Sequence, residues 1–254
     1  IEENLKNLTK DDLVLIFISG GGSALLSYPA KGISLNDKKE LNKILLESGA
    51  NIKEINSVRK HISLIKGGNL ARMCFPSRVH SFILSDVVGD DLSSIASGMT
   101  IPDNSTFQDV IKILRKHKIW NKIPKNVKNH IIKGLENFDL ETPKKNNSIF
   151  QNVSNTLIGS NTLCLKEIHN LCKQKKIKSK IWFKNIEDDV MQLSKKFIKR
   201  LYDKNFPHPI LLISGGETTV KIKGKGKGGR NQEFALHFIK QIKKSLPLMK
   251  FFLL

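Results

Sequence analysis

The sequence predicts an α/β fold with a largely parallel sheet, followed by a smaller second domain. Continuous apolar runs, of which LVLIFI at 13–18 is the clearest, are typical of strands buried on both faces. Segments with apolar residues at helical spacing alternate with these runs, as they do in α/β folds. The chain has 254 residues, and FPHP at 206–209 predicts a boundary between a domain over 1–206 and a smaller one over 207–254.

Further strands are predicted by short runs rich in Val, Ile, Leu and Phe, and by an alternation of Thr, Val and Ile with lysine that is typical of a half-exposed strand. They lie at 79–84, 157–159, 177–183, 210–213 and 218–223.

Helices are predicted where apolar residues recur every three or four positions. Asn36 and Asp37 offer a cap for the first helix, and Gly67-Gly68 divides a helical stretch over 56–74 into two. The remaining helices are expected at 107–118, after Pro124, and at 161–175, 186–202 and 231–244. The polar segment 90–106 predicts a long loop.

The chain carries 43 basic and 23 acidic residues, and its net charge of +20 by itself suggests nucleic acid or an anionic membrane as a partner. Only six of the basic residues are arginine and 7% of all residues are aromatic, whereas nucleic-acid recognition favours arginine and interleaved aromatic residues. The sequence contains no run of 18 apolar residues and predicts no membrane-spanning helix. We therefore expect a small polyanionic substrate, no nucleic-acid partner and no membrane partner.

The three cysteines, Cys74, Cys164 and Cys172, have no CxxC spacing and form no disulfide framework. We expect them to be free thiols in the core of a protein from a reducing compartment, which predicts a cytoplasmic location.

The first candidate site is Ser19-Gly20-Gly21-Gly22-Ser23, which follows the strand at 13–18. Ligands of open α/β sheets bind beyond the carboxyl ends of the strands. Three glycines let the backbone approach an anion closely, and the next helix begins with free N–H groups. The segment is neither a Walker A motif nor GxGxxG. We expect it to bind the phosphates of a cofactor, and a tight strand–helix turn is the alternative.

The second candidate site is Asp86, which follows the strand at 79–84. A carboxylate directly after a buried strand is costly unless it has a partner or a metal ion. Asp86 is therefore a candidate to accept a proton from a substrate hydroxyl or to hold Mg²⁺, and Asp90 is a second candidate metal ligand. A turn at Asp86 and a helix cap at Asp90 are the alternatives.

The third candidate site follows the strand at 210–213, where Gly215, Gly216 and Glu217 end in a carboxylate able to reach a metal ion or a ribose. Arg230 lies where a glycine-rich loop becomes a helix, and its planar guanidinium suits phosphate oxygens.

A fourth segment, 56–61, places Arg59 and Lys60 side by side as candidate ligands of the substrate carboxylate. Their side chains point about 100° apart on a helix, so at most one or two of the basic side chains there face one site. An exposed basic helix is the alternative, and we do not predict His61 to be a catalytic base.

The four candidate sites together contain glycine loops, carboxylates at strand ends and a few basic side chains near them. This combination favours phosphoryl transfer.

The residues of these sites resemble those of the class II glycerate kinases, the glycerate 2-kinases with a C-terminal MOFRL domain. The resemblance covers essentially the whole chain, with 107–206 only weakly patterned, and its motifs occur in the order and spacing of that family. They are SGGGSALL at 19–26, NSVRKHISLIKGGNLA at 56–71, LSDVVGDDLSSIASGMTIPD at 84–103 and LLISGGETTVKIKGKGKGGRNQEFAL at 211–236.

The resemblance implies a kinase that uses ATP and Mg²⁺ to convert D-glycerate to 2-phosphoglycerate. It also implies a Rossmann-like N-terminal domain, a smaller α/β MOFRL-type domain and a site in the cleft between them. The family's motif aspartate maps onto Asp86 and its loop arginine onto Arg230, which are thus the expected catalytic residues. The family has an essential lysine in a segment expected before Ile1 and a TDG-type loop expected beyond Leu254, so we expect a fragment open at both ends.

Two other functions remain as alternatives. An oxidoreductase acting on hydroxypyruvate or tartronate semialdehyde would use similar substrates, but the sequence lacks a nicotinamide fingerprint. A basic nucleic-acid-binding protein is less favoured, for the reasons of composition given above. A homodimer is possible.

Overall fold

The computed structural model describes residues 2–202, 206–207, 209–221, 224, 226 and 228–245. The fold is α/β with parallel sheets, as expected, and the chain forms two compact units, residues 1–160 and 161–254. Positions 222 and 223 of the predicted strand at 218–223, and positions 225 and 227 of the following glycine-rich loop, lie outside the described residues.

The strands of unit 1 are β1 (Leu13–Ile18), β2 (Arg78–Leu84) and β3 (Val153–Gly159), which form a parallel sheet in the order β1-β2-β3. Leu13 pairs with Arg78 and Ile18 with Ile83, so β1 and β2 end at the same edge of the sheet. Parallel pairing thus brings together two loops that are more than 60 residues apart in the sequence.

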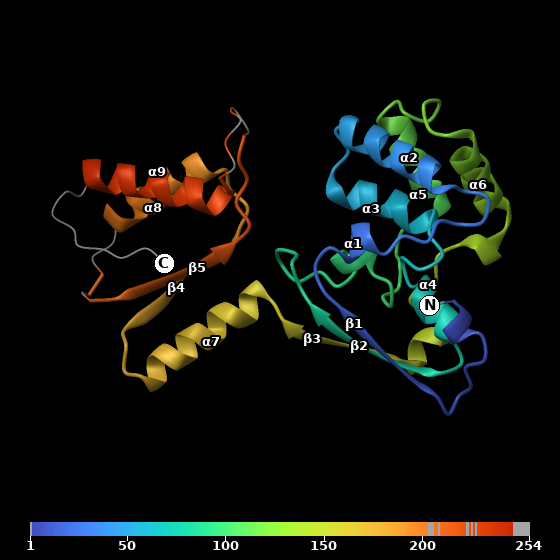
Figure 1. Ribbon diagram of the computed structural model, residues 1–254, viewed down its shortest axis with the longest axis horizontal. Coiled ribbons are helices and arrows are strands. Elements are labelled where there is room, and N and C mark those ends of the chain that lie inside the picture. Colours follow the sequence, from blue (N-terminus) through green and yellow to red (C-terminus); the bar gives the residue numbers. More distant parts are fainter. Residues whose placement is uncertain are drawn as a thin grey trace. The chain divides into compact units, whose positions relative to one another are not determined.

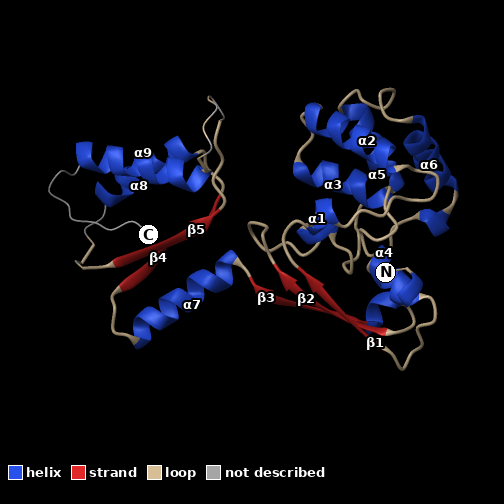
Figure 2. Ribbon diagram, viewed as in Figure 1, coloured by secondary structure: helices blue, strands red, loops and turns tan. Residues whose placement is uncertain are grey.

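The helices of unit 1 lie on one side of this sheet (Figures 1 and 2). They are α1 (Gly22–Leu25), α2 (Leu35–Glu47), α3 (Ile52–His61), α4 (Asn69–Cys74), α5 (Phe107–Lys116) and α6 (Lys125–Glu136), with short 3₁₀ turns at Glu3–Leu5, Ile95–Ser97, Phe138–Leu140 and Ser148–Asn152. The cap of α2 is Ser34, with Asp37 completing the capping box, and not the predicted Asn36.

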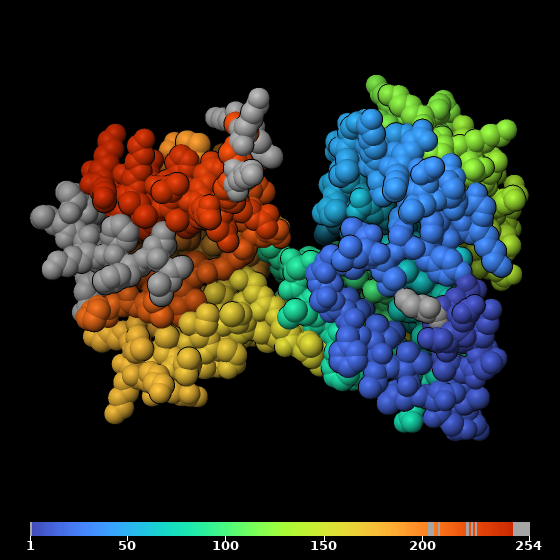
Figure 3. All heavy atoms as spheres, viewed as in Figure 1, coloured from blue at the N-terminus to red at the C-terminus, as the bar shows by residue number. Residues whose placement is uncertain are grey.

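Two apolar clusters form the core of unit 1. One joins α2, α3, α5 and α6 around residues such as Leu41, Val58 and Leu114, and the blue surface of α2 adjoins the green surface of α6 in the space-filling view (Figure 3). The other joins the inner face of the sheet to α4 and the 95–99 segment, around Ile18 and Ile83.

The prediction that 13–18 is buried on both faces is wrong. Leu13, Leu15 and Phe17 alternate with inward-facing residues and are exposed, Phe17 by 74%. Among the described residues of unit 1, the helices cover the opposite face of the sheet, so the outer face of this parallel sheet is open.

The elements of unit 2 are α7 (Asn161–Gln174), β4 (Ser179–Ile186), α8 (Val190–Tyr202), β5 (Leu211–Gly216) and α9 (Arg230–Ser245). β4 and β5 are parallel neighbours, with α7 on one face and α8 and α9 on the other (Figure 2). The described residues 218–221 form no strand, and Thr219 makes only an isolated bridge to Asp189.

The boundary of the compact units therefore differs from the expected boundary at 206/207. The segment 161–202 packs with the residues that follow it, because β4 forms its hydrogen bonds with β5 and α8 packs on α9.

Cys74 and Cys172 are buried, but Cys164 is exposed, which corrects its predicted place in the core. In the part of the chain that the structure describes, none of the helices has both the length and the apolar character needed to cross a membrane.

Candidate active site

The predicted Ser19–Ser23 loop lies against Asp86 in unit 1. β1 ends at Ile18 and β2 at Leu84, so both segments leave the same edge of the sheet. A Cβ atom added to Gly20 would lie 2.7 Å from Oδ2 of Asp86, so only glycine fits there without moving the carboxylate. Gly21 has φ +82°, a conformation that glycine adopts without steric cost. The structure thus unites two of the predicted site segments.

Asp86 is exposed, and the structure gives its carboxylate no hydrogen bond or ion pair with another described residue. The desolvation cost expected from the sequence is therefore small. Asp90 differs, because its backbone is left-handed with φ +57° and its Oδ2 accepts a hydrogen bond from Ser160 Oγ at 2.9 Å. Asp86 is the freer of the two carboxylates to meet a substrate hydroxyl or a cation.

The segment 96–98 contacts the glycine loop and holds it in position. Ala96 and Ser97 have φ +49° and +61°, and a left-handed non-glycine residue costs on the order of 1 kcal/mol or more. The N–H of Gly67 donates to Ser97 O at 2.9 Å and holds the segment in place. Ser97 Oγ lies 3.0 Å from Ser23 Oγ, so this strained backbone fixes the position of the loop.

The candidate substrate ligands Arg59 and Lys60 have different environments, as their spacing on α3 predicts. The Nε of Arg59 donates to Asn42 Oδ1 at 2.8 Å, and the side chain is partly buried. Lys60 forms a buried ion pair with Asp103, at 3.2 Å between Nζ and Oδ1. Because that pair already neutralises Lys60, the structure favours Arg59 over Lys60 as a ligand of a substrate carboxylate.

His61 is a buried, interior histidine. Its Nδ1 lies 2.8 Å from the carbonyl oxygen of Ser57, and its Nε2 lies 2.8 Å from Oε1 of Glu141. Both ring nitrogens are thus committed to structural partners.

Sequence reasoning missed two basic residues beside the loop, Lys38 and Lys66. Lys66 is 0% exposed, and its Nζ donates to the carbonyl oxygen of Ser23 at 3.0 Å. Burial, with added repulsion from Lys38 and Arg59, lowers the pKa of Lys66 to about 8. Lys38 is also buried and donates to Ser27 Oγ, and burial and the charge of Arg59 lower its pKa as well. Only the apolar stretch before Lys66, ISLI at 62–65, hints at its burial in the sequence.

The predicted residues of unit 2 also lie together. Gly216 has φ +150°, and a Cβ added there would collide with the backbone of Ile186. The N–H of Glu217 donates to Ile186 O at 2.7 Å, which fixes the turn after β5. Arg230 is the first residue of α9 and forms an ion pair with Glu217, and both side chains are about half exposed. The pair places a guanidinium and a carboxylate at the end of β5.

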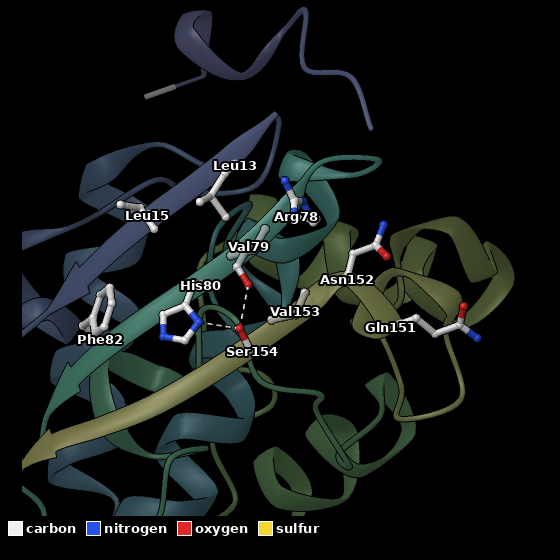
Figure 4. Close-up of a pocket in the computed structure, with 10 residues that line it drawn as sticks. All are labelled: Leu13, Leu15, Arg78, Val79, His80, Phe82, Gln151, Asn152, Val153 and Ser154. Carbon is white, nitrogen blue, oxygen red and sulfur yellow. Dashed lines mark hydrogen bonds between the residues drawn. The ribbon is translucent and has the colours of Figure 1, made fainter. Parts of the chain in front are cut away.

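A groove of about 460 Å³ lies elsewhere in unit 1, on the open face of the sheet (Figure 4). Its lining comes mainly from the amino-terminal halves of β1, β2 and β3 and from the turn before β3, and includes Leu13, Arg78 and Ser154. Ligands of such sheets bind beyond the carboxyl ends of the strands, and this groove is at the amino ends. We therefore assign it to the uncovered sheet face and not to the site.

Among the residues that the structure describes, no group of three or more His, Cys, Asp or Glu side chains is placed to hold a metal ion. Mg²⁺ in phosphoryl transfer is commonly held by one or two carboxylates together with substrate phosphates. The free carboxylate of Asp86 fits that mode of binding. The described residues do not offer a metal site made entirely of protein ligands.

Residues 1–132 match the family described as a domain of unknown function, DUF4147, and residues 210–252 match the MOFRL family. The chain is 43% identical to a glycerate 2-kinase of Pyrococcus horikoshii, over 94% of this chain and 54% of that protein. It is 40% identical to a D-glycerate 2-kinase of Thermotoga maritima, over 92% of this chain and 54% of that protein. The chain belongs to the MOFRL-type glycerate kinase family.

The fold agrees with that of the family. A crystal structure of the Thermotoga maritima glycerate kinase superposes with a TM-score of 0.82 at 38% identity, covering 95% of this chain and 56% of that one. The chain thus spans about half the length of the curated relatives it matches. The MOFRL match begins at residue 210, close to the boundary expected from the sequence, whereas the compact unit begins at Asn161.

Proposed function

We propose that the chain is part of a kinase that transfers the γ-phosphoryl group of ATP to the 2-hydroxyl of D-glycerate and gives 2-phosphoglycerate. The observation that carries this proposal is the free Asp86 carboxylate against Gly20, at the carboxyl ends of two parallel strands. Relatives named glycerate 2-kinase, at 43% and 40% identity, support the substrate. An oxidoreductase is not supported by any of the relatives described above.

In the proposed reaction, the 2-hydroxyl oxygen of glycerate forms a bond to the γ-phosphorus of ATP, and the bond from that phosphorus to the leaving oxygen of ADP breaks. Asp86 orients the hydroxyl and accepts its proton. In the alternative, Asp86 would hold Mg²⁺, which would supply charge neutralisation on the phosphate oxygens, and the hydroxyl proton would pass to water. Asp90 is the second proposed metal ligand.

The proposed phosphate contacts come from the Ser19–Ser23 loop in unit 1 and from Gly215 and Gly216 in unit 2. Arg230 offsets the charge that develops on the transferred group, and Glu217 holds the guanidinium in place through their ion pair. Arg59 is the proposed ligand of the glycerate carboxylate. Lys60 stays a weaker candidate because it is paired with Asp103. A cytoplasmic location, the absence of a nucleic-acid partner and a possible homodimer stay predictions.

The proposal is tested by coupled ADP release on the whole protein with D-glycerate, followed by NMR identification of the phosphorylated position. Asp86→Asn and Arg230→Ala should each lower turnover by roughly a hundredfold or more, because each removes charge or proton transfer from the transition state. Asp86 is exposed and Arg230 is about half exposed, so the melting temperatures should hardly change.

Matched controls are Asp11→Asn and Arg115→Ala, which make the same chemical changes at exposed positions outside the proposed site segments. Their turnover should stay within about twofold of the unaltered protein. Near-normal rates for Asp86→Asn or Arg230→Ala would contradict the assigned roles.

A further inference from the structure

Lys38, Arg59 and Lys66 lie within electrostatic reach of one another, and none is paired with a carboxylate of a described residue. They come from α2, α3 and the segment before α4. Lys66 and Lys38 donate to Ser23 and Ser27, the two ends of the segment that follows the glycines. Two of the three charges thus contact the segment 23–27, and Arg59 lies near enough for its charge to lower the pKa of both lysines.

Such an arrangement opposes folding in the free protein. A buried cation without a counter-ion is costly, and neighbouring cations add to the cost. The low pKa of Lys66, about 8, reflects its burial first and the charges of Lys38 and Arg59 second. The carbonyl oxygen of Ser23 is a neutral acceptor and does not remove the excess charge. An anion bound beside the cluster would remove it.

The identity of this anion rests on the function proposed above. In a 2-hydroxy acid the carboxylate and the hydroxyl are carried by adjacent carbon atoms. If the hydroxyl meets Asp86 beside Gly20, then the carboxylate must lie only a few atoms away from that contact. Lys66 is hydrogen-bonded to Ser23 of the loop that contains Gly20, so the cluster adjoins the loop against which Asp86 lies.

We infer that Lys38, Arg59 and Lys66 supply the counter-charge for the carboxylate of the hydroxy-acid substrate. Arg59 is the most exposed of the three and contacts the carboxylate. Lys66 and Lys38 are positioning residues, which act through the 23–27 segment and through their charge.

The decisive variant is Lys66→Met, which removes the charge and keeps a long side chain. On the whole protein, at constant ionic strength, it should weaken D-glycerate binding in calorimetry and raise the KM for glycerate roughly tenfold or more. The KM for ATP should stay within about twofold. The control is Lys43→Met, an equal charge change on the exposed face of α2, which should leave both values unchanged.

A second measurement uses the unaltered protein and does not depend on the folding of a variant. The ammonium of Lys66 loses its proton as the pH rises above about 8, so its attraction for an anion is present below that pH and is lost above it. The affinity for D-glycerate should thus fall roughly tenfold or more between pH 7 and pH 9.5. Lys38, whose pKa burial and the charge of Arg59 also lower, acts in the same direction.

Three outcomes overturn the inference: an unchanged glycerate KM in Lys66→Met, glycerate affinity that does not change between pH 7 and pH 9.5, or Lys66-dependent binding of inorganic phosphate in place of D-glycerate. In each of these cases the unaltered protein can still phosphorylate glycerate, and the proposed function stands. If the unaltered protein binds D-glycerate in this manner but releases no ADP, the proposed function fails and the anion site remains.

Discussion

Gly20 has no side chain, and this allows the carboxylate of Asp86 to lie against the glycine loop. The sequence predicted that the glycines admit an anion, and the structure adds that Gly20 is the contact for Asp86. Neither residue reveals this contact by itself, because they are 66 positions apart in the sequence and meet only through the pairing of β1 with β2.

Gly20→Ala should lower turnover while changing stability little. The new Cβ atom would displace Oδ2 of Asp86, and a short exposed side chain can rotate away without disturbing the core. We expect turnover to fall roughly tenfold or more, since small displacements of a reacting group are costly. In an Asp86→Asn background the same substitution should have almost no further effect on the rate. Two independent, multiplicative losses would contradict a role exerted through Asp86.

Glu141 connects His61 to the start of α5. Partial burial alone raises the pKa of Glu141, but the hydrogen bond and charge of His61 and the Phe107 N–H hold that pKa well below its usual range. A carboxyl group with a lowered folded-state pKa stabilises the protein fully above its unfolded value near 4.5, and the contribution is lost as the pH falls below that value.

Glu141→Gln should therefore lower the free energy of unfolding by about 2 kcal/mol at pH 7, and the difference should shrink as the pH is lowered from 4.5 towards 3. Urea unfolding at a series of pH values measures this. Glu136→Gln, at an exposed position on α6, is the control and should change stability by less than about 0.5 kcal/mol. A deficit that is independent of pH would show that packing, and not charge, is the cause.

At the scale of single elements, the sequence predicted most helices and strands near their observed positions, because local apolar spacing reports which face is buried. The failures have a physical cause. The run at 13–18 is apolar throughout, so it predicts burial of both faces, but the chain around it covers only one. The alternation at 218–221 predicts a strand, but Thr219 makes only a single bridge.

Helix α6 contains a glycine whose role depends on its neighbour. Gly134 faces the ring of Phe107, and a Cβ added there would overlap with that ring. Replacing an interior helical glycine by alanine normally stabilises a helix by about 1 kcal/mol. Gly134→Ala should instead destabilise the protein by about 1–3 kcal/mol, because Phe107 is buried in the helical core and has little room to move. Chemical denaturation measures the sign, with Lys133→Ala as the exposed control on the same helix. A stabilised Gly134→Ala variant would contradict the packing described here.

At the scale of the whole molecule, each compact unit has apolar clusters of its own. Leu114 and Ile131 belong to the helical core of unit 1, whereas Leu193 and Phe197 belong to the core between β4, α8 and α9 in unit 2. The boundary between the compact units at residue 160 follows from this division of the apolar clusters and does not coincide with the Pro-rich segment near residue 206.

Leu193→Ala should thus open unit 2 before unit 1. Truncating a buried leucine costs about 2–5 kcal/mol, and native-state hydrogen exchange assigns that loss to particular segments. We expect faster exchange in β4, α8 and α9, with protection in α3 and α5 unchanged. Leu114→Ala is the reciprocal variant and should have the opposite pattern. Equal loss of protection in both units would show that they unfold as one.

The sequence by itself determined the α/β class, the order of most elements, the family and the strand-end segments that carry glycines, Asp86 and Arg230, because these are encoded in local spacing and in short motifs. Only the tertiary structure decided that Gly20 contacts Asp86, that Asp103 neutralises Lys60, and that Lys66 is buried beside Ser23. The reason is that desolvation and charge pairing depend on segments brought together from distant parts of the chain. The sequence around a lysine therefore does not reveal whether water or protein surrounds its side chain.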